Sequence, residues 1–257
     1  MLQTTILATQ AIAFTPARTK VIAPAAKSAV SCSACCLQGV CLPCGLSAQD
    51  LDRFGDMVAT KRRVARGASL YRSGDGFEYL YAVRSGAFKT VGVSRHGEEK
   101  ITGFHLAGEL LGLDAISAGR YGYSAVALED SEVCAMPFAA LERMSLSVPA
   151  LQRQLFRALS GDISRDHGLM LLLGSMSAEQ RLAAFLLSLS RRYQRLGFAA
   201  DRFVLRMTRE EIGNYLGLTL ETVSRLLSRF QRDGLLAVHQ REIELRSVER
   251  LREIVGQ

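Results

Sequence analysis

The fold of the C-terminal part of the chain is decided by one stretch, IGNYLGLTLETVSR at residues 212–225. It follows TREE at residues 208–211, which has the form of a capping box in which Thr208 caps a helix and Glu211 reaches back to the cap. Gly217 permits a sharp turn after this short helix, and Thr219 then caps a second helix. Cap, turn and cap in this order predict a helix-turn-helix.

The second helix of this motif has two faces. Apolar residues at i, i+3, i+4 and i+7 give a buried face made of Val223, Leu226, Leu227 and Phe230. The opposite face carries Glu221, Ser224, Arg225, Ser228 and Arg232. Arginine can donate two hydrogen bonds to guanine and glutamate can accept one from cytosine, so this face suits a DNA major groove. Hydroxyls and free N–H groups at helix N-termini suit phosphates. We therefore expect DNA contacts from Glu221, Ser224, Arg225, Thr208, Thr219 and Thr222.

The composition agrees with a nucleic-acid partner without proving one. The 257 residues suggest about two domains, and 48% hydrophobic residues supply enough material for packed cores. A net charge of +7 suits a polyanion. No apolar run approaches the roughly 20 residues of a membrane-spanning helix, so we expect a cytoplasmic protein without a membrane partner. Residues 1–31 contain no acidic residue, which fits either a transit peptide or a flexible N-terminal arm, and the lack of a clear amphipathic period favours the arm.

The middle of the chain has the pattern of a β-structure followed by a long helix. Between Lys61 and Pro137, short apolar runs such as 79–83 and 100–104 alternate with glycines, which predicts an antiparallel β-barrel or jelly roll. From about residue 148 an apolar stripe recurs every three or four residues, and its members are Leu151, Leu155, Leu159, Ile163, Asp166, Met170 and Leu173. A stripe this narrow favours a dimer seam over one face of an ordinary core helix. We expect an interface made of Leu155, Phe156, Leu159, Ile163, Asp166 and Met170.

Five of the six cysteines lie within thirteen residues, at positions 32, 35, 36, 41 and 44, and the sixth is Cys134. Disulfides are not expected in a reducing cytosol, and thiolates are soft ligands for zinc or iron–sulfur clusters. The pairs 32/35 and 41/44 could hold one zinc ion, but a loop of five residues between pairs is far shorter than the roughly 15–20 that such sites use. A second grouping joins Cys32, Cys35 and Cys41 to Cys134.

The helix-turn-helix stretch resembles that of the cyclic-AMP receptor superfamily, and within it the FNR-type oxygen-responsive regulators. The likeness runs from about Cys32 to Gly256. It implies an α+β fold: an N-terminal antiparallel β-roll like a cyclic-nucleotide-binding domain, a long dimerisation helix, and a C-terminal winged helix-turn-helix. It also implies a [4Fe–4S] cluster held by Cys32, Cys35, Cys41 and Cys134, a homodimer on double-stranded DNA, and a TTGAT half-site in a two-fold symmetric operator, with mainly anaerobic genes activated.

Composition and periodicity divide the chain into the arm (1–31), the cysteine segment and β-roll (32–147), the dimerisation helix with a hinge at Gly174–Ser177 (148–176), and the DNA-binding domain (177–257). In the last, helical segments at 178–195 and strands near 236–238 and 243–245 are expected. The resemblance places contacts with RNA polymerase near Gly97 and Ser117–Tyr121. In relatives that bind cyclic nucleotides, an arginine that clamps the phosphate follows the segment matched by Gly108–Leu110. Here Tyr123 and Ser124 stand at that place, so cyclic AMP is not expected as a ligand.

Asp166 interrupts the apolar stripe, and two copies across a two-fold axis would repel each other. Our hypothesis is that Asp166 keeps the cluster-free chain monomeric or only weakly paired. An intact cluster would reposition the helix so that Ile163 and its neighbours bury together and offset the repulsion. Cys36 and Cys44 are expected to be bystander thiols, or to accept sulfur or form disulfides after cluster loss.

Two alternatives stay open: the same scaffold with zinc or a thiol redox switch, and an enzyme carrying a cluster. The enzyme is disfavoured because no nucleotide-binding glycine loop is present and the four histidines are scattered.

Overall fold

The N-terminal part of the chain is a β-roll, as the sequence predicts. The computed structural model describes residues 32–58, 60–94 and 97–256, so the expected arm at 1–31 lies outside the described residues. Two four-stranded antiparallel sheets face each other, and their hydrogen-bonded orders are β1-β8-β3-β6 and β2-β7-β4-β5. The strands of the first are β1 (Thr60–Val64), β8 (Ser131–Pro137), β3 (Tyr79–Ser85) and β6 (Leu110–Leu111). Those of the second are β2 (Ser69–Tyr71), β7 (Ser124–Ala127), β4 (Ala87–Val93) and β5 (Glu99–Leu106).

Three helices close one end of the roll. α1 (Ala48–Met57), α2 (Phe138–Ser147) and the start of α3 (Pro149–Ser175) pack Phe54, Leu141 and Leu151 into one apolar cluster with Leu80 and Met136 of the sheet. Neither α1 nor α2 is predicted by the sequence pattern. A 3₁₀ turn (Leu113–Ala115) follows β6.

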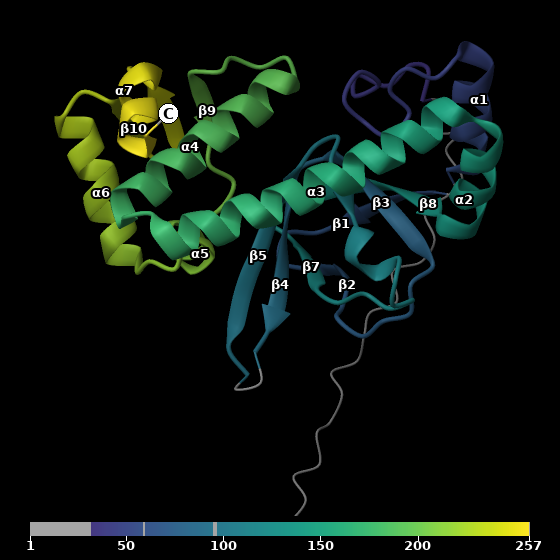
Figure 1. The fold of residues 1–257 in the computed structure, drawn as a ribbon, viewed down its shortest axis with the longest axis horizontal. Helices are drawn as coiled ribbons and strands as arrows, with labels where there is room; N and C mark the ends of the chain where they lie inside the picture. Colours follow the sequence, from purple (N-terminus) through teal and green to yellow (C-terminus); the bar gives the residue numbers. More distant parts are fainter. Residues whose placement is uncertain (1–31, 59, 95–96, 257) are drawn as a thin grey trace, which may run out of the picture.

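α3 runs from the roll to the C-terminal domain and joins the two (Figure 1). The long helix expected here is confirmed, but the hinge expected at Gly174–Ser177 is shorter, because α3 continues through Ser175. Arg181 explains the extension, since its guanidinium donates to the carbonyl oxygens of Leu173 (2.8 Å) and Met176 (2.9 Å). Ser177 then caps α4 (Ala178–Arg195) through a capping box with Gln180.

The C-terminal domain contains the expected helix-turn-helix. It consists of α4, β9 (Arg202–Val204), α5 (Arg209–Leu216), α6 (Leu220–Arg232), β10 (Leu236–His239), β11 (Glu242–Leu245) and α7 (Val248–Val255). Strands β10, β11 and β9 form the wing. Glycine is required inside the motif, because a Cβ on Gly213 would lie 2.7 Å from the carbonyl oxygen of Leu218. The turn itself is made by Gly217 in a left-handed conformation, with φ +65°.

The β4–β5 hairpin extends from the roll to the C-terminal domain and lies beside α5 (Figure 1). Ile101 and Phe104 of β5 belong to the same apolar cluster as Phe185 of α4 and Ile212 and Leu216 of α5. The two domains therefore share one core at this joint. Among the described residues, no helix is both long and apolar enough to cross a membrane.

Candidate DNA-binding surface and cysteine pocket

Both helices of the motif begin at a threonine cap. The Thr208 hydroxyl accepts from the Glu211 backbone N–H at 3.1 Å, and the Glu211 carboxylate accepts from the Thr208 N–H at 2.7 Å. The Thr219 hydroxyl accepts from the Thr222 N–H at 3.2 Å and lies 3.1 Å from the Thr222 hydroxyl. These hydroxyls hold the helix ends together, so the phosphate role expected of them adds to a structural one.

The recognition face of α6, formed by Glu221, Ser224, Arg225, Ser228 and Arg232, is open to solvent. Ser224 is half-buried and the other four residues are exposed. On the opposite side Val223, Leu227 and Phe230 are fully buried in the domain core, as their spacing predicts. Hydrogen bonds from its own backbone N–H and from Thr219 hold the pKa of Glu221 below its usual value, which keeps it an acceptor.

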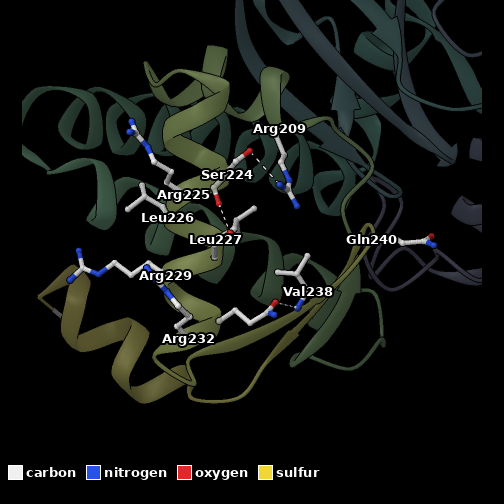
Figure 2. Close-up of a pocket in the computed structure, with 11 residues that line it drawn as sticks. Arg209, Ser224, Arg225, Leu226, Leu227, Arg229, Arg232, Val238 and Gln240 are labelled. Carbon is white, nitrogen blue, oxygen red and sulfur yellow. Dashed lines mark hydrogen bonds between the residues drawn. The ribbon is translucent and has the colours of Figure 1, made fainter.

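A groove of about 860 Å³ lies between α6 and the wing (Figure 2). Four arginines line it, at positions 209, 225, 229 and 232, together with Gln240 at the tip of the wing. Arg209 donates to the Ser224 hydroxyl at 3.3 Å (Figure 2). Arg209, Arg229 and Gln240 were not among the expected DNA contacts. Arg209 of α5 and Gln240 of the wing are brought beside α6 only by the tertiary fold, whereas Arg229 lies on α6 itself.

The cysteine pocket is formed by Cys32, Cys35, Cys41 and Cys134. These four thiols line one cavity of about 30 Å³, although Cys134 comes from β8 and the others from the cysteine loop, residues 32–44. Its remaining walls are mainly apolar, and the set includes Leu37, Pro43, Phe54, Val58, Val83, Arg84 and Met136. Cys36 is exposed, and the Cys44 thiol donates to the Gly39 carbonyl oxygen at 3.2 Å; neither lines the cavity.

The environment of the cysteine pocket disfavours thiolates in the metal-free chain. Burial, followed by the nearby Cys134 and Cys35, raises the pKa of Cys32 to about 11. Burial raises the pKa of Cys41 to about 12, and that of Cys134 is also raised by burial. Four thiolates can share this space only when a positive centre is present. Within the described parts of the chain, no three Cys, His, Asp or Glu side chains are spaced to hold a single metal ion.

The stripe of α3 separates into two parts. Phe156, Ile163 and Met170, seven residues apart, are 59%, 56% and 65% exposed, and Asp166 is exposed beside them. By contrast, Leu151 is fully buried, while Leu155 and Leu159 are partly buried against the apolar cluster that also contains Cys32, Cys41 and Cys134. Leu151, Leu155 and Leu159 therefore join α3 to the roll of its own chain. Phe156, Ile163 and Met170 leave an apolar face of the helix uncovered.

The chain is similar to known regulators along nearly its whole length. Residues 61–147 match the model of the cyclic nucleotide-binding domain, and residues 180–254 match that of the Crp-like helix-turn-helix domain. The transcriptional regulatory protein btr of Bordetella pertussis is 48% identical over 91% of this chain and 97% of its own length. The fumarate and nitrate reduction regulatory protein of Escherichia coli is 44% identical over 89% of this chain and 91% of its own.

A solved structure shows the same arrangement of elements. FixK2 of Bradyrhizobium japonicum is similar to this chain with a TM-score of 0.70 and 34% sequence identity. The likeness covers 76% of this chain and 96% of that one. The β-roll, the long helix and the helix-turn-helix are therefore held in common.

Proposed function

The chain belongs to the FNR-type transcription regulators of the cyclic-AMP receptor superfamily, and on this basis we propose that it senses oxygen through a [4Fe–4S] cluster. Cys32, Cys35, Cys41 and Cys134 would hold the cluster. The protein would act in the cytoplasm as a homodimer on TTGAT-type palindromic operators when oxygen is absent, and it would mainly activate anaerobic genes through RNA polymerase, with polymerase contacts near Gly97 and Ser117–Tyr121.

The proposal depends most on which cysteines line the cysteine pocket. Of six cysteines, the four that line the cavity are those that the resemblance implies as ligands, and the two that stay outside are Cys36 and Cys44. The walls around these partly buried thiols are mainly apolar. When bound, a [4Fe–4S] cluster supplies a redox-active, oxygen-labile centre that takes one thiolate per iron.

The donor set fits a multi-iron cluster better than one zinc ion. The zinc arrangement considered from the sequence uses Cys32, Cys35, Cys41 and Cys44, but Cys44 does not line the cavity and Cys134 does. A [4Fe–4S] cluster takes one thiolate per iron, and the four cysteines that share the cavity supply four. The same scaffold with zinc or a thiol switch is the alternative.

The residues around the cysteine loop give a route from the pocket to α3. Gln154 of α3 donates to the Cys44 carbonyl oxygen at 2.8 Å. Leu155 and Leu159 pack in the apolar cluster that includes three of the four pocket cysteines. A rearrangement of the loop therefore changes what this part of α3 packs against. Pairing of two chains through Phe156, Ile163 and Met170 would respond to that change.

Asp166 is the residue that we propose opposes pairing. It is exposed on the uncovered face of α3, and partial burial and the neighbouring Asp162 raise the pKa of its carboxyl group. Facing copies in a dimer would bring two such carboxylates together in a less solvated seam. The remaining apolar contacts must outweigh that repulsion before a stable dimer forms.

Cyclic AMP has no place in this proposal. Uncharged Tyr123 and Ser124 stand where relatives that bind cyclic nucleotides have the arginine that clamps the phosphate, and the Glu109 carboxylate is already bound by Arg192. Burying an unpaired phosphate would be costly. We therefore assign the sensing role of this β-roll to the cysteine pocket and not to a nucleotide site.

The proposal is tested by purifying the full chain without oxygen. We expect about four irons and four acid-labile sulfides per chain, a visible absorption band that bleaches in air, and binding of a TTGAT palindrome that weakens in step with the bleaching. Colourless protein without sulfide would refute the cluster. Zinc without iron would support the alternative, and operator binding that ignores air would separate DNA recognition from oxygen sensing.

A further inference from the structure

The outer edge of β5 is closed by a side chain of the helix-turn-helix. Among the described residues β5 is the last strand of its sheet, so the N–H and C=O groups on its free side have no strand partner there. Asn214 of α5 supplies one: its amide oxygen accepts from the Ile101 N–H at 2.7 Å and its amide nitrogen donates to the Glu99 carbonyl oxygen at 2.9 Å. One side-chain amide thus imitates the peptide group of a neighbouring strand.

Contacts on either side of Asn214 strengthen this attachment. The Lys100 ammonium donates to the Asn214 backbone carbonyl oxygen. One turn earlier, the Glu211 carboxylate pairs with Lys89 of β4 at 2.8 Å, and both side chains are about one-fifth exposed. Tyr215, the next residue, packs on Phe104 of β5 with ring centroids 5.1 Å apart. One face of α5 is therefore fastened to the β4–β5 hairpin by hydrogen bonds, an ion pair and an aromatic contact.

The attachment leaves the recognition face free. Glu221, Arg225 and Arg232 of α6 are exposed while α5 is fastened to the hairpin. The groove beside α6 is also open in this arrangement. DNA can therefore reach α6 while α5 is fastened to the hairpin, because the roll does not cover the recognition face.

We propose that Asn214 is a positioning residue for DNA binding, which fastens the first helix of the motif to β5 and thereby sets the direction in which α6 faces the operator. The inference rests on the operator-binding part of the proposed function and not on the cluster. A ligand's apparent affinity falls in proportion to the fraction of protein in the competent state. Loosening α5 from β5 therefore weakens operator binding without removing any contact to a base.

The test is Asn214→Ala in the full chain, with Ser190→Ala as the matched control. Ser190 also loses one hydrogen bond of the same domain, from its hydroxyl to the Ala200 carbonyl oxygen at 2.6 Å, but it does not contact β5 or line the groove. Operator affinity is measured on anaerobic protein, at concentrations where it is dimeric. Amide hydrogen exchange at Ile101 is followed in parallel.

We expect Asn214→Ala to bind the operator about tenfold more weakly, to expose the Ile101 amide to exchange, and to keep the wild-type ratio between matched and single-mismatch operators. Ser190→Ala should keep wild-type affinity. Unchanged or tighter binding with an exposed Ile101 amide would overturn the proposal, and so would an Ile101 amide that stays protected.

A second variant changes a residue of the β-roll that contacts α5, in case Asn214→Ala does not fold. Lys89→Met removes the ion pair with Glu211 without changing the DNA-binding domain. A loss of about threefold in operator affinity supports the proposal, and no loss contradicts it. Wild-type protein that contains no iron but binds the operator would refute the cluster and leave this test intact.

Discussion

Arg192 of α4 and Glu109 of the β-roll form a two-point ion pair across the joint between the domains. The guanidinium donates to the carboxylate at 2.8 and 2.6 Å, and a further bond reaches the Phe104 carbonyl oxygen at 2.6 Å. Burial favours the neutral acid, but the attraction of Arg192 outweighs it and holds the pKa of Glu109 below its usual value. The pair is less than one-fifth exposed, so water screens it little.

Removing one partner of this pair should destabilise the protein strongly. Glu109→Leu or Arg192→Leu leaves an uncompensated buried charge, which typically costs about 3–5 kcal/mol. Urea unfolding of the full chain measures the loss. The double variant should be more stable than either single one. Arg202→Ala is the control, because Arg202 pairs with Glu244 at 3.7 Å and is 60% exposed, and its loss should cost less than about 1 kcal/mol. Single variants as stable as this control would contradict the buried pair.

Cysteine variants should separate into two classes by iron content. Cys41→Ala and Cys134→Ala each remove one wall of the cysteine pocket, and we expect them to lose most iron and sulfide when isolated anaerobically. Cys36 and Cys44 lie outside the cavity, so the variants Cys36→Ala and Cys44→Ala should keep the wild-type iron content. Iron and sulfide analysis decides between the classes. Equal loss in all four variants would mean that the pocket does not define the ligand set.

Two arginines of α6 should affect DNA binding differently. Arg225→Ala should cost about 1–3 kcal/mol on the matched operator and relax selectivity at one base pair, since a lost bidentate base contact acts locally. Arg232→Ala, at the end of the same face, should weaken matched and mismatched operators equally and reduce the salt dependence. Titrations on single-substitution operators at two salt concentrations measure both. Uniform loss from Arg225→Ala would remove it from base recognition.

Asp166→Ala should produce a dimer in air. The substitution removes the proposed repulsion and extends the apolar face of α3, so pairing no longer requires an intact cysteine pocket. Analytical ultracentrifugation of aerobic protein gives the association state. Ile163→Glu, which adds a charge to the same face, should prevent dimers even without oxygen. An aerobic Asp166→Ala protein that stays monomeric would defeat this explanation of the switch.

His105 should make stability sensitive to mild acid. Burial, opposed by Glu109, lowers the pKa of His105 to about 4 from 6.5. Its Nε2 lies 3.3 Å from the Thr90 hydroxyl, and its Nδ1 has no hydrogen-bond partner in the part of the chain that the structure describes. The unfolded chain takes up a proton as pH falls below 6.5, whereas the folded chain does not until about 4. The free energy of unfolding should therefore fall from pH 7 to pH 5. His105→Gln should flatten this slope in urea titrations, and an unchanged slope would exclude His105 as its source.

The sequence predicts the helix-turn-helix well because its determinants are local. Caps, the turn glycine and the i, i+3, i+4, i+7 spacing all lie within about 25 residues, and the structure reproduces each of them. β9 was missed because three residues carry little periodicity. α7 has Leu251 and Val255 on one buried face and could have been found from that spacing.

The candidate sites were predicted in part. The resemblance named Cys134 as a partner of the cysteine loop, but only the pairing of β8 with β1 and β3 shows how it reaches the pocket. The stripe of α3 could not be divided into its two parts from spacing alone, because Leu155 and Ile163 have the same apolar character. The role of Asn214 could not be predicted from the sequence, since its partners are backbone atoms of a strand more than 100 positions away.

The closure of β5 also bears on how the molecule can be divided. A fragment ending near residue 176 would leave Ile101 and Phe104 facing water and would offer a bare strand edge as a template for other chains. Such a sensor fragment should aggregate when expressed alone. The DNA-binding domain thus shields an edge and an apolar surface of the β-roll in the same chain. Separating the two domains would therefore lower the solubility of the β-roll as well as uncouple it from DNA binding.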